Sequence, residues 1–465
     1  MRYIYLILFL TAQLLSGQET ISEFDLELKG LRSKRNVFSI VENDRISLFF
    51  DNKKEMKCYL LDNNKTVSSE FIFDRPHRKY KNILGYITEG DHDFLYFGNK
   101  KKNSFAVLDV NFKTKNSSVQ EIDLKLEGVF LDAFSINKKF YLLSLTDNSV
   151  LNLYCLNNRT TVSLSKYPID KKIKLGENLI AYSGLSLVKN LEKIENNTPN
   201  SIENTSSYNK IYTTDSEVII TLDVNDKFTR LIKIDFNRNK AVIEKIEHIT
   251  VAENKERSRS NSFFHQGKLY QLSATRKNLA FSYYDLETKE RSKVIKLNVN
   301  DSIWFKNSDI IQEKTDFFNS ERKLSKTKQF LRKVAFSKPG ISIVSVNGTN
   351  QITIGGVSEI ANGGGFMMGG AVSGAIGGMT SVYMSPTFYS YGSYSSTKST
   401  FINCLFDNML GHKEGEFKDN AFDKIKAYED SVYHGLKLKT VFKYQNKYIF
   451  GYYSGDKYNL RVFNH

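Results

Sequence analysis

The sequence is poor in cysteine, proline and tryptophan. Cys58, Cys155 and Cys404 are the three cysteines among 465 residues, an odd number at wide spacing. A framework of several disulfides is therefore excluded and thiols buried on strands are expected, with a single disulfide between two of the three left open. Five prolines and one tryptophan stand against 33 phenylalanines and 26 tyrosines. Because aromatic residues favour strands, this balance predicts a chain built mainly of β-structure.

The chain also lacks the common short motifs of enzymes and metal sites. Its seven histidines show no His-x-x-x-His spacing, and there is no Gly-x-Ser-x-Gly, P-loop or dinucleotide fingerprint. The nearest approach to a metal loop, Glu-Gly-Asp-His-Asp at 89–93, is better explained by a hairpin turn. We therefore predict no catalytic residue, no metal site and no cofactor from motifs. Paired carboxylates assembled from distant parts of the chain would leave no such motif.

The charge is positive, and the overall composition is globular. Lys and Arg number 66 and Asp and Glu 51, which gives a formal net charge of +15, with 40% apolar and 25% charged residues. This composition excludes wholesale disorder. A basic surface suits an anionic partner such as an acidic glycan or a lipid headgroup, but over a chain of this length it is more typical of a solvated surface. A nucleic acid is not expected as a partner.

The first 18 residues have the layout of a secretory signal peptide. A short basic start is followed by an apolar run over residues 4–10 and then by the small residues Ser16 and Gly17. The apolar run is too short to span a bilayer, and cleavage is predicted near residue 17 or 18. We therefore expect an exported protein that is secreted, periplasmic or associated with the cell envelope. The fold is expected to begin at residue 19.

Runs of five to eight residues rich in Phe, Tyr, Ile, Val and Leu alternate with polar turns along the rest of the chain. Three consecutive groups of four such runs cover 36–74, 82–124 and 129–168. A third run that ends in Asp or Asn recurs at intervals of 47, 48, 78, 50, 122 and 57 residues. Most intervals fit one four-stranded propeller blade, so seven markers predict seven blades. The markers are Asp62, Asp109, Asn157, Asp235, Asp285, Asp407 and Asn464.

On this pattern the chain resembles the β-propeller superfamily from about residue 23 to residue 465. The resemblance is one of architecture, because there is no WD dipeptide at blade ends, no kelch double glycine in register and no Asp-box. It implies an all-β fold, a seven-bladed β-propeller of four-stranded blades, as a single domain over residues 19–465. A β-sandwich or a pair of sandwiches is the alternative architecture. We expect the protein to be a monomer.

The last repeat has three strand-like runs, and a strand from the N-terminal region is predicted to complete it. The segment EFDLELKG at 23–30 alternates apolar and charged residues and closely matches EIDLKLEG at 121–128 in the second repeat. A final blade without its outer strand would leave an open sheet edge. We therefore predict that residues 23–30 pair with residues 458–464 and close the ring.

The two long intervals predict inserts at about 171–209, 299–336 and 360–397, and a short helix is predicted at about 419–434. The inserts fall between blades or between the second and third strands of a blade, positions that share one face of a propeller. Inserts gathered on one face of a repeat fold often mark the binding face. Tolerated decoration is the alternative interpretation. The basic segment within the second insert is a candidate for phosphate or acidic-glycan contact or is a solvated connector; its candidate residues are Arg322, Lys323, Lys326 and Lys328.

The insert at 360–397 contains no charged residue and is rich in glycine. Its Gly-x-x-x-Gly spacings would let helices pack closely in lipid, but its low content of Leu and Ile disfavours a membrane span. A loop over the channel mouth is the preferred interpretation, and contact with lipid or a protein partner is the second. Its second half, with tyrosines among serines, has a composition common on binding surfaces. The candidate binding residues are Phe366, Met367, Met368, Tyr383, Phe388, Tyr389, Tyr391 and Tyr394.

The sequence leaves two classes of function open. The first is an exported, non-enzymatic binding or scaffold module that recognises a protein, glycan or envelope partner through the insert-bearing face. The second is a hydrolase or lyase that acts on an extracellular polysaccharide or peptide at the channel mouth. Three or more Asp, Glu, His or Arg side chains in contact at the mouth would favour the enzyme. A mouth of Ser, Asn and aromatic residues would favour the binding module.

Overall fold

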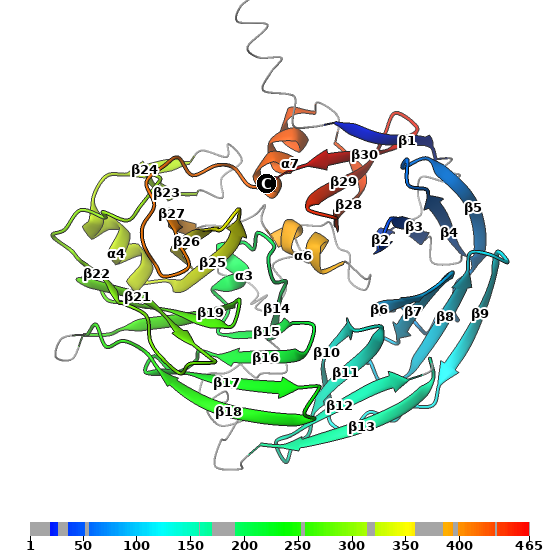
Figure 1. Ribbon diagram of the computed structural model, residues 1–465, viewed down its shortest axis with the longest axis horizontal. Helices are drawn as coiled ribbons and strands as arrows, with labels where there is room; N and C mark the ends of the chain where they lie inside the picture. The colour runs from blue at the N-terminus through cyan, green and yellow to red at the C-terminus, as the bar shows by residue number, and fades with distance from the viewer. Residues whose placement is uncertain are drawn as a thin grey trace, which may run out of the picture.

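The strands of this protein form a ring of sheets around one axis (Figure 1). Within the described residues of the computed structural model there are seven sheets, five of four strands and two of five. The chain is therefore a seven-bladed β-propeller, as the repeat pattern predicts, and the sandwich alternative is wrong. The structure describes residues 19–26, 36–51, 55–157, 159–169, 191–252, 256–313, 321–358, 385–393, 399–432 and 435–464.

The first three blades are regular four-stranded antiparallel sheets whose strands follow one another in sequence from the axis outward. The second strands, such as β3 (Arg45–Asp51) and β7 (His92–Gly98), are buried on both faces because neighbouring blades pack against them. The outer strand β9 (Asn116–Ile122) is exposed along most of its length. Blade 1 consists of β2 (Asn36–Glu42), β3 (Arg45–Asp51), β4 (Glu55–Leu61) and β5 (Val67–Asp74). Blade 2 consists of β6 (Asn82–Glu89), β7 (His92–Gly98), β8 (Phe105–Asn111) and β9 (Asn116–Ile122). Blade 3 consists of β10 (Val129–Ile136), β11 (Lys139–Leu145), β12 (Val150–Asn157) and β13 (Thr161–Pro168).

Blades 4 and 5 follow the same plan, with one addition to blade 4. A short strand, β14, pairs in parallel with the innermost antiparallel strand, β15, on its axis side. Blade 4 consists of β14 (Leu191–Ile194), β15 (Asn209–Thr213), β16 (Glu217–Leu222), β17 (Phe228–Asp235) and β18 (Lys240–Glu247). Blade 5 consists of β19 (Arg259–His265), β20 (Lys268–Ala274), β21 (Asn278–Asp285) and β22 (Ile295–Asn298).

Blade 6 takes its outer strands from the segment that precedes it in sequence. The short strand β23 pairs with β27 through Ile311↔Phe401 and Gln312↔Thr400, and β24 pairs with β23 in turn. The predicted insert at 299–336 thus supplies two strands and a helix, α4 (Thr327–Ala335). Blade 6 consists of β25 (Lys338–Val346), β26 (Thr349–Val357), β27 (Ser399–Phe406), β23 (Ile310–Gln312) and β24 (Arg322–Leu324). The predicted helix at 419–434 is α7 (Ala421–Ser431), which begins at Asn420 with a capping box.

Blade 7 is completed by the N-terminal strand, as predicted. β1 (Thr20–Asp25) lies antiparallel to β30 (Lys457–Phe463), with Phe24 opposite Tyr458. Phe24 also packs on Tyr59 of blade 1, with ring centroids 4.7 Å apart, so the closing strand joins the last blade to the first. The pairing segment is shifted toward the N-terminus relative to the predicted 23–30, of which residues 27–30 lie outside the described residues. The inner strands of blade 7 are β28 (Lys437–Tyr444) and β29 (Lys447–Ser454).

Among the recurring Asp and Asn residues, Asp62, Asp235 and Asp285 stand at the ends of third strands and shape the turns to the outer strands. Asp62 Oδ1 accepts a hydrogen bond from the Thr66 amide at 2.9 Å. Asp235 and Asp285 accept in the same way from amides two and three residues ahead. These bonds mimic the main-chain bond of a turn. They also hold the carboxyl pKa of Asp62 and Asp285 below the ordinary range.

The three cysteines lie on the third strands of three different blades as free thiols. Cys58 and Cys404 are buried and Cys155 is partly buried, so the prediction of strand thiols is confirmed. No helix in the described ranges combines the length and apolar character needed to cross a membrane. The predicted signal peptide at 1–18 lies outside those ranges.

Candidate functional site at the propeller axis

Two segments from the predicted inserts meet inside the ring. One is residues 191–208, which contain β14 and the short helix α3 (Ile202–Thr205), and the other is α6 (Pro386–Ser393). Figure 1 shows α3 and α6 in the middle of the ring, encircled by the blades. We refer to these two segments together as the axial plug. α6 belongs to the glycine-rich insert, which connects β26 to β27 as predicted, and residues 359–384 and 394–398 lie outside the described residues.

The first plug segment crosses the ring from blade 4 to blades 6 and 7. β14 is held by its parallel pairing with β15 from Leu191 to Ile194. Beyond it, the Asn197 carbonyl accepts from the Tyr448 hydroxyl at 3.3 Å, and the Asn200 carbonyl accepts from Ser342 Oγ at 2.6 Å. α3 then packs directly on β25, where a Cβ at Gly340 would lie 2.8 Å from the Ile202 carbonyl oxygen. Gly340 therefore permits the close approach of α3 to blade 6.

The second plug segment is fixed by aromatic packing. Phe388 and Tyr391 of α6 are buried against α7 and the inner strands of blade 7. The Tyr391 ring lies edge to face with Phe422 of α7, at a centroid distance of 5.4 Å. Its hydroxyl donates to Glu429 of the same helix. The apolar side of α6 is therefore committed to the wall of the ring.

Polar side chains join the two plug segments to each other. The Tyr389 hydroxyl donates to Glu192 Oε1 at 2.7 Å, and Thr387 Oγ1 donates to Glu195 Oε1 at 2.9 Å. Ser390 Oγ donates to Asn200 Oδ1 at 3.1 Å. These bonds connect residues about 190 positions apart in sequence, so they form only in the completed ring.

Three carboxyl groups of the plug have raised pKa values. Burial raises the pKa of Glu192 to about 7, against the opposing effect of the Tyr389 hydrogen bond. Burial also raises the pKa of Glu203 to about 7, and the carboxylates of Glu192 and Glu313 add to this shift. The pKa of Glu195 is raised by burial as well, and its Oε2 atom has no hydrogen-bond partner among the described residues. Carboxyl groups that titrate near neutral pH are suited to proton transfer.

Two lysines accompany these carboxyl groups. Lys193 Nζ pairs with Asp132 on β10 at 3.2 Å and donates to the Ala133 carbonyl at 2.7 Å. Lys443 Nζ on β28 lies 3.9 Å from Glu195 Oε1, and burial lowers its pKa. The axis thus combines four acidic and two basic side chains with Ser, Thr, Asn and Tyr. The charged side chains correspond in part to the criterion for an enzyme. The Ser, Asn and Tyr side chains correspond in part to the criterion for a binding module.

The structure describes three of the eight binding residues predicted in the glycine-rich insert. Phe366, Met367, Met368, Tyr383 and Tyr394 lie outside the described residues. Phe388 and Tyr391 are buried anchors of α6, and Tyr389 is partly buried against Glu192. Their role in binding a partner stays a prediction.

The four basic candidates are all exposed, on β24 and at the start of α4. Lys323 pairs with Asp309 at 2.8 Å, whereas Lys326 is the N-cap residue of α4. Arg322 lies at the start of β24, and Lys328 lies in the first turn of α4. The segment is therefore part of blade 6 and its covering helix, and the solvated connector interpretation fits its exposure.

Sequence reasoning missed the acidic residues of the plug. Glu192 and Glu195 stand three positions apart in the run Leu-Glu-Lys-Ile-Glu, where Leu191 and Ile194 give a short apolar pattern. Charged residues within such a run could have indicated a buried polar site. Glu203 gave no signal of this kind, because its environment depends on contacts across the ring.

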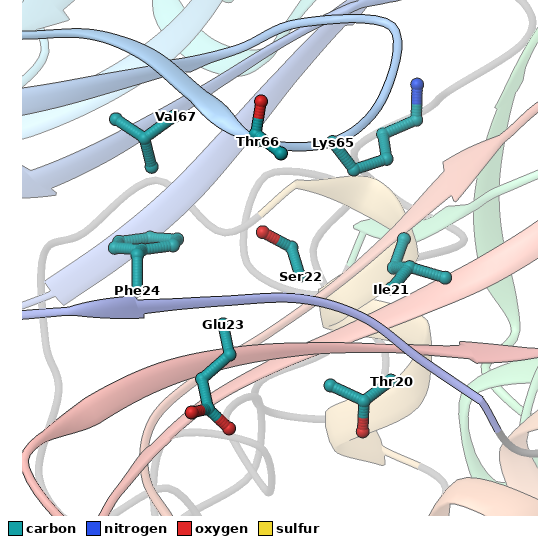
Figure 2. Close-up of a pocket in the computed structure, with 8 residues that line it drawn as sticks. All are labelled: Thr20, Ile21, Ser22, Glu23, Phe24, Lys65, Thr66 and Val67. Carbon is teal, nitrogen blue, oxygen red and sulfur yellow. The ribbon is translucent and has the colours of Figure 1, made fainter.

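Two shallow hollows on the described surface lie away from the axis. One, of ≈ 510 Å³, lies between β1 and the turn from β4 to β5, where Figure 2 shows Phe24 facing Val67 across the gap. The other, of ≈ 570 Å³, lies beside blade 6 and is lined by residues 306–309, His412, Glu414 and Gly415. In the part of the chain that is described, no three His, Cys, Asp or Glu residues are grouped so as to hold a metal ion.

Comparisons with known proteins find likeness in architecture alone. No protein-family model matches the sequence. No curated protein matches it either. The β-propeller domain of the Trilobed protease from Pyrococcus furiosus is 7% identical, with 92% of this chain and 95% of that chain covered and a TM-score of 0.34. The polysaccharide lyase Uly1 is 8% identical, with 85% and 93% covered and a TM-score of 0.34.

A structure from a study of two prolyl endopeptidases is 9% identical, with 69% of this chain and 41% of that chain covered and a TM-score of 0.33. At such identities and TM-scores these likenesses carry no information on activity. The fold follows from the seven sheets themselves, and these make the chain a seven-bladed member of the β-propeller architecture.

Proposed function

We propose that this protein is an exported, non-enzymatic binding or scaffold module that recognises its partner through the insert-bearing face of the propeller. The observation that carries the proposal is the axial plug. The hypothesis of a hydrolase or lyase places the substrate at the channel mouth. In the structure, α3, α6 and β14 occupy the axis. Their polar side chains are bonded largely to one another. A ring whose axis is plugged and whose inserts share one face is suited to recognition at that face.

The binding face follows from the strand directions. Successive strands of a blade alternate in direction, so connections between second and third strands lie on the same face as connections between blades. The segment between β26 and β27, the first plug segment and α4 all enter from this face. We expect the partner to be a protein or a glycan, with association at a membrane surface as a further option.

The test compares the chain of residues 1–465, with its predicted signal peptide, and a variant in which residues 361–384 are replaced by a short Gly-Ser linker and α6 is kept. Both are expressed in the native host, cross-linked, fractionated and purified by a C-terminal tag. The variant is expected to keep the melting temperature and lose the partner or the envelope association of the parent. Identical partners and fractions for both chains would refute recognition through the insert. Recovery of the parent inside the cytoplasm would refute export.

A second candidate is a hydrolase or lyase that acts on an extracellular polysaccharide or peptide. The observation in its favour is the set of raised pKa values at Glu192 and Glu203, together with the unbonded Oε2 atom of Glu195. The test is an assay against polysaccharide and peptide panels, with Glu192→Gln and Glu195→Gln as variants. An activity that both variants lose while they stay folded would establish the enzyme. Activity absent from the parent chain would exclude the enzyme, and activity unchanged in both variants would exclude a catalytic role for Glu192 and Glu195.

A further inference from the structure

Two neighbouring connections on the insert-bearing face carry a concentrated positive charge. Residues 75–81 join β5 to β6, and residues 99–104 join β7 to β8. Together they contain seven Lys or Arg residues and no Asp or Glu. The next two connections on this face, 123–128 and 146–149, contain three acidic residues and one lysine. These two connections are therefore much more positive than the two that follow them on the same face.

A buried arginine gives the first of these connections its shape. The Arg75 side chain is 6% exposed and forms an ion pair with Asp51 at 3.0 Å. Its Nη1 and Nη2 atoms donate to the carbonyls of Tyr80 at 2.7 Å and Lys81 at 3.1 Å. The guanidinium of Arg75, at the start of the loop, thus bonds to the two residues at its end. Lysine could not supply this rigid geometry.

Further bonds tie the two connections to each other. Tyr80 is 1% exposed, and its hydroxyl accepts from Ser104 Oγ at 3.4 Å. Asn82 Nδ2 donates to the Asn99 carbonyl at 3.2 Å. The relative position of the two basic loops is therefore fixed before any ligand binds, which lowers the entropic cost of binding.

The outward-facing cations of these loops are largely uncompensated. Arg78, Lys81, Lys100 and Lys101 are exposed, and no carboxylate of the described residues lies within ion-pair distance of them. Lys79 is the one exposed lysine of the two loops that is paired among those residues, with Glu121 at 2.7 Å. Four unpaired like charges on rigid, adjoining loops repel one another, and an anionic ligand would relieve this repulsion. We name Arg78, Lys81, Lys100 and Lys101 the basic patch.

We propose that the basic patch binds an acidic polysaccharide, a polymer with regularly spaced carboxylate or sulfate groups. This inference rests on the proposed function, since it assigns a partner class to the same face. Tyr80, the one tyrosine of the two loops, is buried, and the loops contain no Phe or Trp for the base stacking that single-stranded nucleic acids use. The residues of the basic patch are all charged, without the apolar anchor that a membrane-binding surface needs. Recognition by fixed charge alone matches a hydrophilic polyanion.

The test uses the folded mature chain and immobilised alginate, dextran sulfate and neutral dextran, with binding measured at 50 and 200 mM NaCl. The parent is expected to bind one or both anionic polymers and not dextran, and to lose at least about tenfold in affinity at the higher salt. The variant R78E/K81E/K100E/K101E is expected to lose at least about tenfold at 50 mM.

The matched control is K113E/K115E/R238E/K240E, which reverses four charges on exposed hairpins of the opposite face. Both quadruple variants lower the formal net charge by eight, since each of the four reversals removes two charges. The control is expected to bind within about threefold of the parent. An equal loss in both variants would show a general charge effect and overturn the assignment of the patch.

Two more probes test the class of ligand. Vesicles with anionic lipid and a single-stranded oligonucleotide are each compared with the polymers at equal charge concentration. Tighter binding to either probe than to both polymers would overturn the polysaccharide assignment. A parent that binds neither polymer would overturn it too, but would leave the proposed function standing, because that function fails only in the linker and fractionation experiment.

Discussion

The ring is closed at its rim and filled at its axis, and these two closures use different kinds of bond. At the rim, β1 adds to β30 by main-chain pairing over five residue pairs. At the axis, α6 meets the first plug segment through side chains, such as Tyr389 on Glu192 and Thr387 on Glu195. Strand addition requires little more than alternating apolar and polar residues, whereas the plug requires particular side chains in particular places.

The difference indicates separate roles for the two closures. Rim closure joins the last blade to the first, so its loss should affect the whole ring. The plug contacts the inside of the ring, and its loss should loosen the axis and leave the blades paired. The four experiments below test this separation.

Deleting residues 19–26 should have the largest effect. The deletion exposes the edge of β30 and removes the buried Leu26 and the packing of Phe24, at a cost of about 4–6 kcal/mol. A lower melting temperature and partial aggregation are expected by differential scanning calorimetry and light scattering. Adding a peptide of residues 19–30 should restore part of the loss. An unchanged melting temperature would refute rim closure as a stabilising feature.

Replacing Phe388 by alanine should have the next largest effect, and it should be local. Phe388 is 8% exposed and anchors α6, so its truncation should cost about 2–4 kcal/mol in docking α6. Limited proteolysis should cut near α6 much faster than in the parent, while the melting temperature falls less than after the deletion of β1. Phe336→Ala is the control, because that ring is 62% exposed. Equal falls in melting temperature for Phe388→Ala and the deletion would contradict the separation.

The pH dependence of stability should change when Glu192 is replaced by glutamine. With the pKa of Glu192 raised to about 7, the folded chain keeps a proton that the unfolded chain releases above its ordinary pKa near 4.5. Stability therefore falls as pH rises from about 4.5 to 7. Glutamine cannot ionise, so the free energy of unfolding, measured in urea, should fall less between pH 5 and pH 7 in the variant than in the parent. An equal dependence of stability on pH in Glu192→Gln and the parent would contradict the prediction.

Replacing Glu23 by glutamine should have the smallest effect. Glu23 pairs with Lys457 across the closing strands, but the two side chains are 45% and 48% exposed. Exposed ion pairs are screened by water and salt and contribute little. The melting temperature should therefore change little at low salt and not at all at high salt. A shift comparable with the deletion of β1 would show that rim closure depends on charge rather than on main-chain pairing.

The blades could be predicted from the sequence because each repeats the same local chemistry. Asp62, Asp235 and Asp285 recur because each caps the same turn after a third strand. The closing strand could be predicted because the alternation of its residues survives without its partner. Its exact bounds could not, since the pairing of Thr20 with Arg461 depends on how far β30 extends toward the C-terminus.

The outer strand of blade 6 and the candidate site could not be predicted in the same way. β23 has three residues, too few for an alternating pattern, and its position depends on β27 nearly 90 residues later. Glu192 and Tyr389 likewise meet only through the folded ring, and no spacing in the sequence connects them. Local sequence patterns thus predict the blades, whereas the candidate site depends on contacts across the axis.

The pairing of β1 with β30 also bears on how the chain is made. Glu23 and Lys457 are 434 positions apart, so β1 must wait through the synthesis of the six intervening blades before it can pair. During that time its edge and the growing edge of the last blade are open to other chains. Glu23 and Asp25 on β1 and Lys457 on β30 place charge on these edges, and charge on an open edge discourages pairing with a foreign strand. These charges therefore add little stability to the finished ring, but before the ring closes they discourage pairing of its open edges with other chains.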